Sequence, residues 1–205
     1  NFKITKNLAL ELNKLFLEVI IANSFDSNAL KILKKKTNLI LIDSKNFKLN
    51  EILKFSSVNG EILLQTEDLK KISNRNFKVV SKKKPTIKQF RDLVFAFNVC
   101  RYVKSNAIIL ASNQTTVGIG SGQPSRLDSC QLAINKMKKF NLDNDDLVAA
   151  SDAFFPFVDG IEKLVQSGAR AIIQPSGSIR DKEIINFANE TDTVLIFSKT
   201  RHFKH

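Results

Sequence analysis

The chain has 205 residues, of which 43% are hydrophobic and 25% charged, and this is the composition of a folded globular protein. Its 25 Lys and seven Arg outnumber 20 acidic residues and give a formal net charge of +12, and the chain has one Tyr and no Trp. The lysines are scattered and the 16 Phe fall mainly in apolar patterns, which indicates a solvated surface rather than a nucleic-acid site. No apolar run reaches the roughly 18 residues of a membrane span.

The cysteines and histidines argue against a metal centre. Cys100 and Cys130 form no C-x-x-C pair, and the only histidines, His202 and His205, stand at the end of the chain. Protein zinc sites need several such ligands at close spacing. We therefore expect reduced thiols and no zinc. No cationic start followed by an apolar stretch is present, so we also expect a cytoplasmic location, with neither membrane nor nucleic acid as a partner.

The first 81 residues alternate between helical and extended patterns. Leu8, Leu12 and Leu15 recur at helical spacing within residues 7–16. An Asn-Gly pair at 59–60 lies between two extended runs and predicts a hairpin turn. The other elements expected here are a strand at 18–22, a helix at 27–36, and strands at 38–43 and 76–81.

A second region begins after Lys82–Pro85, which is the best candidate boundary. Thr86 can cap a long helix that reaches Lys104. Asn113 and Gln114 separate two apolar runs and predict a second hairpin, formed by 107–111 and 116–119. Beyond it we expect helices at 125–140, 159–166 and 181–189, the last opened by a Ser178–Asp181 capping box, and strands at 147–151, 171–174 and 193–197. The chain is therefore α/β throughout.

Similar strand–helix–strand patterns occur at 19–43 and 148–175. Either such units are common to any α/β chain, or the chain holds two subdomains of one fold in tandem. These connections favour parallel strands, and sites gather at the carboxyl ends of such strands. The loops after Ser151 and Pro175 and the residues after Phe197 lie at such ends.

The first candidate cluster is the glycine-rich stretch Gly118–Arg126. Glycines at alternate positions lead from a strand into a helix, where backbone N–H groups can approach an anion and Arg126 can close on a phosphate. The stretch is neither a G-x-G-x-x-G nor a P-loop motif. On spacing alone, a plain glycine-rich turn explains it at least as well.

The second cluster is the aromatic loop Ser151–Asp159. Three Phe surround Pro156 after a strand that ends in Ser-Asp, and Asp159 precedes a helix. This loop suits a flat heterocycle whose N–H groups an aspartate can accept, or it is a hydrophobic loop that closes the core.

Three further positions have both a functional and a structural interpretation. In Pro175–Asp181, the N–H groups of Ser178 and Ile179 can meet an anionic or carbonyl ligand, or the segment simply caps a helix. Asn106 can bind a ligand amide or merely end a helix. The closing Arg201–His205 is either a docked tail, since an apolar strand leads to it, or a mobile end.

These clusters occur together, and in this order, in one known family. The chain resembles the C-terminal region of bifunctional purine biosynthesis proteins, which combine aminoimidazole carboxamide ribonucleotide (AICAR) formyltransferase with inosinate cyclohydrolase. Six ordered motifs are far more specific than any one of them, and the similarity covers nearly the whole chain. The matching stretches are FLEVIIA (16–22), VKSNAIILA (103–111), GIGSGQPSR (118–126), ASDAFFPF (150–157), IIQPSGSIRD (172–181) and TRHFKH (200–205).

The resemblance implies a three-layer, cytidine-deaminase-like fold, with a mixed sheet flanked by helices and without the deaminases' zinc. Residues 1–81 would be the remainder of a first such subdomain, and residues 86–205 the second. The implied reaction moves a formyl group from the co-substrate 10-formyltetrahydrofolate to the 5-amino group of AICAR in IMP biosynthesis. The family also implies a homodimer with sites built across its interface.

The resemblance also assigns site residues. Arg126 and Arg201 offer forks for phosphate and carboxamide, and Asn106 positions the carboxamide beside the attacking amine. Phe154 can pack on the pterin, and Asp159 can accept its N–H groups. The implied AICAR contacts are Glu18, Asn106, Arg126 and Arg201. The implied folate contacts are Leu127, Phe154, Asp159, Ser178 and Ile179.

Three positions depart from the family pattern and bear on the folate geometry. Asn23 stands where the family usually has Pro, Val158 stands where it has Arg, and Pro124 replaces a less rigid residue.

The family's catalytic Lys-His pair has no counterpart in this chain, because His202 and His205 do not match it. Proton transfer needs a base within hydrogen-bond reach of the amine. The only Met is Met137 and the chain opens at Asn1, so we expect a fragment or processed product that does not turn over alone. The alternatives are a diverged, nonenzymatic remnant or interaction module of the same fold and, least favoured, a basic nucleic-acid module.

Overall fold

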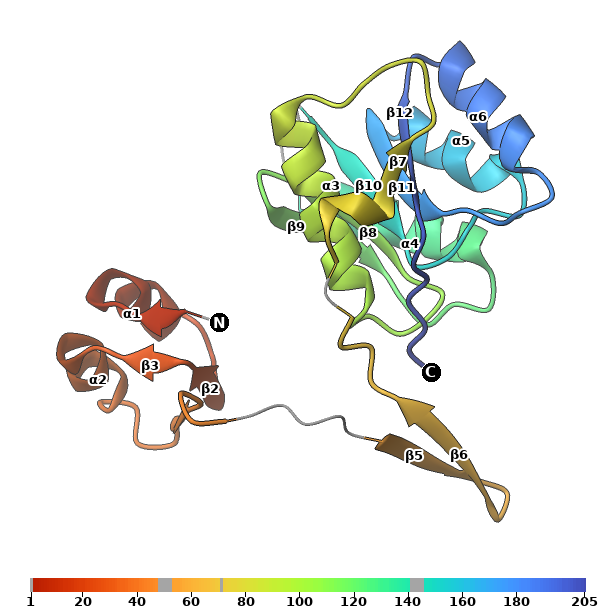
Figure 1. Ribbon diagram of the computed structural model, residues 1–205. Coiled ribbons are helices and arrows are strands. Elements are labelled where there is room, and N and C mark those ends of the chain that lie inside the picture. Colours follow the sequence, from red (N-terminus) through yellow and green to blue (C-terminus); the bar gives the residue numbers. More distant parts are fainter. Residues whose placement is uncertain (1, 48–52, 71, 141–145) are drawn as a thin grey trace. The chain divides into compact units, whose positions relative to one another are not determined.

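The computed structural model describes residues 2–47, 53–70, 72–140 and 146–205, and the chain separates into two compact units. The units are Asn1–Glu67 and Asp68–His205 (Figure 1). This division lies upstream of the boundary expected after residue 81. The reason is that β7 (Phe77–Val79) pairs antiparallel with β12 (Val194–Ser198), so the strand belongs to the sheet of the larger unit.

The smaller unit packs two short helices against pairs of short parallel strands. Asp26 links the two helix starts, because its carboxylate accepts the Ala29 N–H at 2.6 Å and the Lys6 N–H at 3.0 Å. The apolar core includes Ala9, Ala29 and the fully buried Leu33. The elements are β1 (Lys3–Ile4), α1 (Lys6–Asn13), β2 (Val19–Ala22), β3 (Ser24–Phe25), α2 (Ser27–Leu33) and β4 (Ile40–Asp43), with β1 paired to β3 and β2 to β4.

The hairpin predicted from the Asn-Gly pair is confirmed. Strands β5 (Leu53–Val58) and β6 (Glu61–Thr66) pair antiparallel, with Val58 opposite Glu61. Asn59 and Gly60 both have positive φ, 50° and 85°, as a two-residue turn between twisted strands requires.

A six-stranded mixed sheet forms the centre of the larger unit, in the order β7-β12-β11-β10-β8-β9. The three middle strands β10, β11 and β12 run parallel, and the outer pairings are antiparallel. The strands not yet bounded are β8 (Ile108–Ser112), β9 (Thr115–Gly120), β10 (Val148–Ser151) and β11 (Ala171–Pro175). The turn between β8 and β9 is at Asn113 and Gln114, as predicted, with φ of 51° and 53°.

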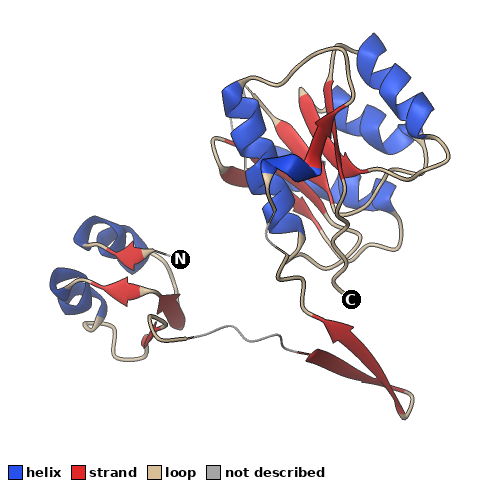
Figure 2. Cartoon of the chain, in the orientation of Figure 1, coloured by secondary structure: helices blue, strands red, loops and turns tan. Residues whose placement is uncertain are grey.

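Helices cover both faces of this sheet (Figure 2). Helix α3 (Ile87–Cys100) packs on one face, where Ile109 and Val148 point, and α4 (Arg126–Lys139) packs on the other, where Ile108 and Ala149 point. The remaining helices are α5 (Val158–Gln166), α6 (Asp181–Glu190) and the 3₁₀ turn η1 (Asn74–Asn76). This mixed sheet flanked by helices confirms the α/β class. Within the described ranges, no helix combines the length and apolar character needed to span a membrane.

Helix α3 begins where predicted and ends earlier. Thr86 and Gln89 form a reciprocal capping box, with bonds of 3.1 and 3.0 Å. The helix stops at Cys100 rather than Lys104. The next backbone groups pair elsewhere: Ser105 N–H donates to the carbonyl of Lys204, and the Lys104 carbonyl accepts from Gly122.

Candidate functional site

A cavity of about 550 Å³ lies in the larger unit, between the β10–α5 loop, the start of α4 and the closing segment of the chain. Its walls combine aromatic surface with two guanidinium groups. It brings together six of the predicted site residues, namely Asn106, Arg126, Leu127, Phe154, Asp159 and Arg201. The other lining residues are Pro124, Ser125, Ala153, Phe155, Pro156, Phe157, Gly160 and Phe203.

Arg126 is held by the protein through both terminal nitrogens. One nitrogen donates to Ser151 Oγ at 3.1 Å and pairs with the Asp152 carboxylate, and the other donates to Asn106 Oδ1 at 2.9 Å. The Arg126 side chain is 10% exposed and that of Asp152 is fully buried. The positive charge of Arg126 is therefore compensated within the protein, which sequence reasoning did not anticipate.

Asn106 does not end a helix, because α3 already stops at Cys100. Its amide nitrogen donates to the backbone carbonyls of Gln123 and Pro124, both at 3.0 Å. Its backbone carbonyl accepts from Ser129 Oγ at 2.8 Å. Asn106 thus ties the start of β8 to the loop and helix that carry Arg126.

Arg201 is exposed and lies between two of the predicted clusters. Its guanidinium stacks over the Phe154 ring at 4.7 Å. A methyl group added at Gly177, which has a φ of 116°, would lie 3.0 Å from an Arg201 terminal nitrogen. The closing segment therefore meets both the aromatic loop and the loop that precedes α6.

Ser178 and Ile179 lie outside the cavity lining. The expected Ser178–Asp181 capping box forms only in part: the Ser178 Oγ accepts the Arg180 N–H at 3.2 Å rather than that of Asp181, and α6 has no side-chain cap at its start. The Asp181 carboxylate accepts from Gly177 N–H at 2.8 Å and Ser178 N–H at 3.2 Å, since positive φ at Gly177 folds the loop back. The Ser178 N–H is thus already bonded, while the Ile179 side chain is fully exposed.

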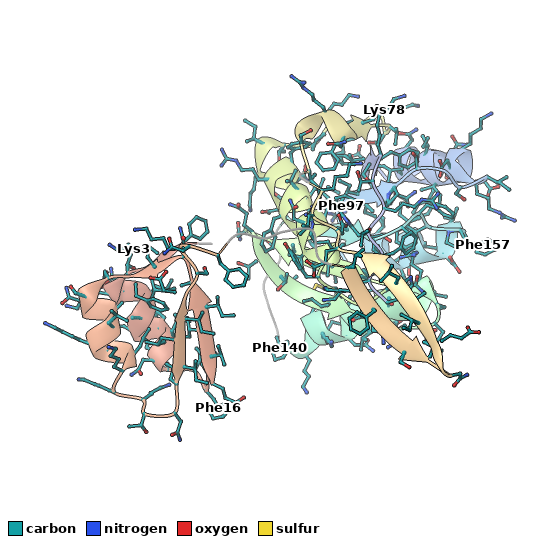
Figure 3. All side chains as sticks on the ribbon, turned by 60° about the horizontal axis from the view of Figure 1, so that its bottom comes forward. Lys3, Phe16, Lys78, Phe97, Phe140 and Phe157 are labelled. Atoms are coloured by element: carbon teal, nitrogen blue, oxygen red, sulfur yellow. The ribbon has the colours of Figure 1, made fainter. Side chains whose placement is uncertain are left out.

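The aromatic loop closes the core with one ring and lines the cavity with another, so its structural role is confirmed and its ligand-binding role stays a prediction. Phe155 is 1% exposed and contributes to the core, where Gly160 leaves space for its ring. Phe154 faces the cavity, and Phe157 is half exposed, at the surface of the larger unit (Figure 3). Arg180 stacks over Phe157 at 4.7 Å and connects this loop to the one before α6.

The glycine-rich stretch allows a helix, rather than an anion, to approach the backbone. Gly118 and Gly120 lie inside β9, beneath α4. A Cβ at Gly120 would lie 2.6 Å from the carbonyl carbon of Ser129, and one at Gly118 would lie 3.1 Å from that of Ala133. Gly122, with φ 69°, makes the turn that follows. The anion-cradle interpretation of Gly118 and Gly120 is therefore wrong.

The closing segment is docked through His202, and neither histidine lines the cavity. His202 is 1% exposed, and its ring Nδ1 is hydrogen-bonded to the Asp68 carboxylate. Its ring centroid lies 4.5 Å from that of Phe97, which Figure 3 shows inside the larger unit. Burial lowers the pKa of His202 from 6.5, although the bond to Asp68 acts in the opposite direction.

The remaining predicted residue, Glu18, is in the smaller unit, where it precedes β2 and accepts the Ile40 N–H on its backbone carbonyl at 2.8 Å. Burial raises the pKa of both thiols, that of Cys130 to about 12. In the part of the chain that the structure describes, no group of three or more potential ligands gathers into a metal site.

Comparison with known proteins gives the family. The AICARFT/IMPCHase bienzyme family matches residues 1–136 of the chain. The chain belongs to this family. It is 45% identical to the bifunctional purine biosynthesis protein PurH of Persephonella marina and 44% identical to that of Aquifex aeolicus, over 100% of this chain and 40% of each relative. PurH of Buchnera aphidicola is 47% identical over 94% of the chain and 37% of the relative.

The family resemblance inferred from the six motifs is therefore confirmed, and the chain spans about 40% of the length of these relatives.

Within the family's motif ASDAFFPF, sequence reasoning missed Asp152. An acidic residue directly after a buried strand was the available indication, since such a carboxylate needs a partner. That partner is Arg126, which lies 26 positions earlier in the sequence.

Proposed function

We propose that this chain is the C-terminal part of the AICAR formyltransferase of a bifunctional purine biosynthesis protein. In this role it binds AICAR and the co-substrate 10-formyltetrahydrofolate, in the pathway to IMP. The observation that carries the proposal is the cavity that joins an exposed Arg201, a charge-compensated Arg126 and an aromatic loop. An anionic nucleotide and a flat heterocycle are the ligands that such walls suit.

The nucleotide contacts in this proposal are divided by charge. Arg201 has an exposed guanidinium beside Phe154 and takes the anionic part of AICAR. Arg126 and Asn106 form a corner without net charge, together with Asp152, and take the neutral carboxamide.

The folate contacts are proposed from the aromatic loop outward. Phe154 packs on the pterin, Leu127 adds apolar surface, and the Asp159 carboxylate accepts pterin N–H groups. The loop before α6 contributes Ser178 and Ile179, with the Ile179 N–H as the donor, because the Ser178 N–H is bonded to Asp181.

Formyl transfer forms a C–N bond to the amine of AICAR and breaks the bond from the formyl carbon to N10 of the folate. The amine loses a proton and N10 gains one, so a base must stand close to the amine. Among the residues that the structure describes, neither histidine and no lysine lines the cavity. We propose that the base comes from outside these 205 residues, from another part of the protein or from the second subunit of a homodimer.

The same proposal extends to the fold. The larger unit is the second cytidine-deaminase-like subdomain, with residues 86–205 as its body and β7 added at one edge of its sheet. The smaller unit is the remainder of the first such subdomain.

Calorimetry on the purified chain tests the proposal with AICAR and with 5-formyltetrahydrofolate as a stable folate analogue. We expect both to bind, with no formyl transfer. Arg201→Ala should lower the affinity for AICAR by about tenfold or more, because it removes a guanidinium that can bind an anion through two N–H groups. Arg170→Ala is the matched control, because Arg170 precedes the amino end of β11 and is exposed outside the cavity. A folded chain that binds neither ligand would favour the nonenzymatic remnant.

A further inference from the structure

We infer that Asp152 is the positioning residue that orients Arg126 and sets the net charge of its corner to zero, so that this corner selects a neutral carboxamide over a carboxylate. The inference rests on the proposed function. It assigns Asp152 a role in choosing the nucleotide, although Asp152 does not line the cavity.

Asp152 bonds to all three segments that carry the proposed nucleotide contacts of the larger unit. Its side chain pairs with Arg126 directly. Its other carboxylate oxygen accepts the N–H of Ala107, the neighbour of Asn106, at 3.0 Å. Its backbone carbonyl accepts the N–H of His202, the neighbour of Arg201, at 2.9 Å. One residue therefore holds the three contacts in register.

The side-chain bonds also fix the direction of the corner. With one terminal nitrogen of Arg126 held by Asp152 and Ser151, the other donates to Asn106 Oδ1 at 2.9 Å. The Asn106 amide nitrogen is committed to Gln123 and Pro124. The guanidinium plane is thus set by protein partners before any ligand enters, which is the preorganisation a selective site requires.

Electrostatics give the selectivity. A fully buried carboxylate beside a guanidinium that is 10% exposed leaves a corner with no net charge. A carboxylate ligand gains no ion-pair advantage there and still loses its hydration, whereas a carboxamide loses less hydration and can exchange neutral hydrogen bonds. Without Asp152, the uncompensated Arg126 would favour the anionic ligand.

Asp152→Asn tests this inference, because it keeps the shape of the side chain and removes its charge. Affinities for AICAR, for its 4-carboxylate analogue and for 5-formyltetrahydrofolate are measured by calorimetry on the chain. We expect AICAR to weaken by about tenfold, the preference for carboxamide over carboxylate to shift by at least about tenfold, and the folate analogue to stay within about threefold.

Asp92→Asn is the matched control. Asp92 is also buried, at 1% exposure, and accepts two backbone N–H groups, from Asn113 at 2.9 Å and Gln114 at 2.7 Å. It holds the β8–β9 turn and lies outside the cavity lining. We expect Asp92→Asn to lower the melting temperature without changing the ratio of the two nucleotide affinities. A purely structural role for Asp152 would give that same pattern and would overturn the inference.

A second pair of variants covers the case in which Asp152→Asn does not fold. Arg126→Gln is compared with the double variant Arg126→Gln/Asp152→Asn, in which neither charge remains. Because Asp152 acts through Arg126, the double variant should bind AICAR within about twofold of Arg126→Gln. A further tenfold loss would contradict action through Arg126. A folded wild-type chain that binds the folate analogue and shows no binding of AICAR would overturn the proposed nucleotide function, and this inference with it.

Discussion

Replacing Gly120 with alanine should force α4 away from the sheet. A Cβ at this position would lie 2.6 Å from the carbonyl carbon and 2.9 Å from the Cα of Ser129, whereas ordinary contact begins at 3.4 Å. The obstacle is helix backbone, which no rotamer change can remove. Helix α4 would have to withdraw by roughly 1 Å or more to restore contact distances.

The magnitude follows from the cost of overpacking a core, which is typically about 1–3 kcal/mol. We expect the upper end, about 3 kcal/mol, because the displaced group is backbone in a closely packed layer. For a domain of this size, such a loss lowers the melting temperature by about 6–12 °C. Ser129 also donates to the carbonyl of Asn106 at 2.8 Å, so the displacement reaches the cavity.

Gly168→Ala is the control for this change. Gly168 has open space around it but a φ of 103°, so alanine there costs about 1–2 kcal/mol of backbone strain without any clash. Both variants are compared by thermal and urea unfolding, and by calorimetry with AICAR. Gly120→Ala should lose more stability than Gly168→Ala and should alone weaken AICAR. Gly120→Ala with a melting temperature equal to that of the wild type would refute the close-packing explanation.

Three further predictions concern single features of the larger unit. Thr86→Ala should cost about 1 kcal/mol in urea unfolding, because it removes the capping box of α3, and an unchanged midpoint would contradict this role. Between about pH 7.5 and pH 5.5, the melting temperature of His202→Gln should fall less than that of the wild type. Burial lowers the pKa of His202 below 6.5, so in this pH range the unfolded wild-type chain binds more protons than the folded one and the folded state loses stability. An equal fall in both proteins would contradict this. At about pH 8, Cys130 should react with iodoacetamide on the order of a thousandfold more slowly in the folded chain than in urea, because its pKa is raised from 9.0 to about 12, and comparable rates would contradict its burial.

Local chemistry predicted most elements because their causes lie close together in sequence. Thr86 and Gln89 are three residues apart, and their capping box needs no distant partner. The Asn113-Gln114 turn likewise follows from a polar pair between two apolar runs, because Asn113 tolerates positive φ. The end of α3 could not be predicted in this way. It depends on Ser105 pairing with Lys204, 99 positions away along the chain, which no local pattern encodes.

The polar partners of the candidate site have the same limitation. The motifs identified Arg126 as a ligand contact and His202 as part of a basic tail. Their partners are Asp152 and Asp68, separated from them by 26 and 134 positions. A buried carboxylate needs a compensating charge, so the sequence could predict that Asp152 has a partner. Only the fold shows that this partner is Arg126, and that the Asp152 carboxylate neutralises the Arg126 charge before any ligand binds.

The glycines of β9 show that a glycine-rich motif can lie next to a site without itself binding the ligand. Glycine allows a close approach to its backbone, whatever the approaching group is. At Gly118 and Gly120 the expected neighbour was a bound anion, and the observed neighbour is the backbone of helix α4. Yet this packing still serves the cavity, because it sets the depth of the helix whose first residues are Arg126 and Leu127. A glycine-rich motif beside a site therefore identifies a position where another group packs directly against the backbone. The fold determines whether that group is a ligand or, as here, a helix of the protein.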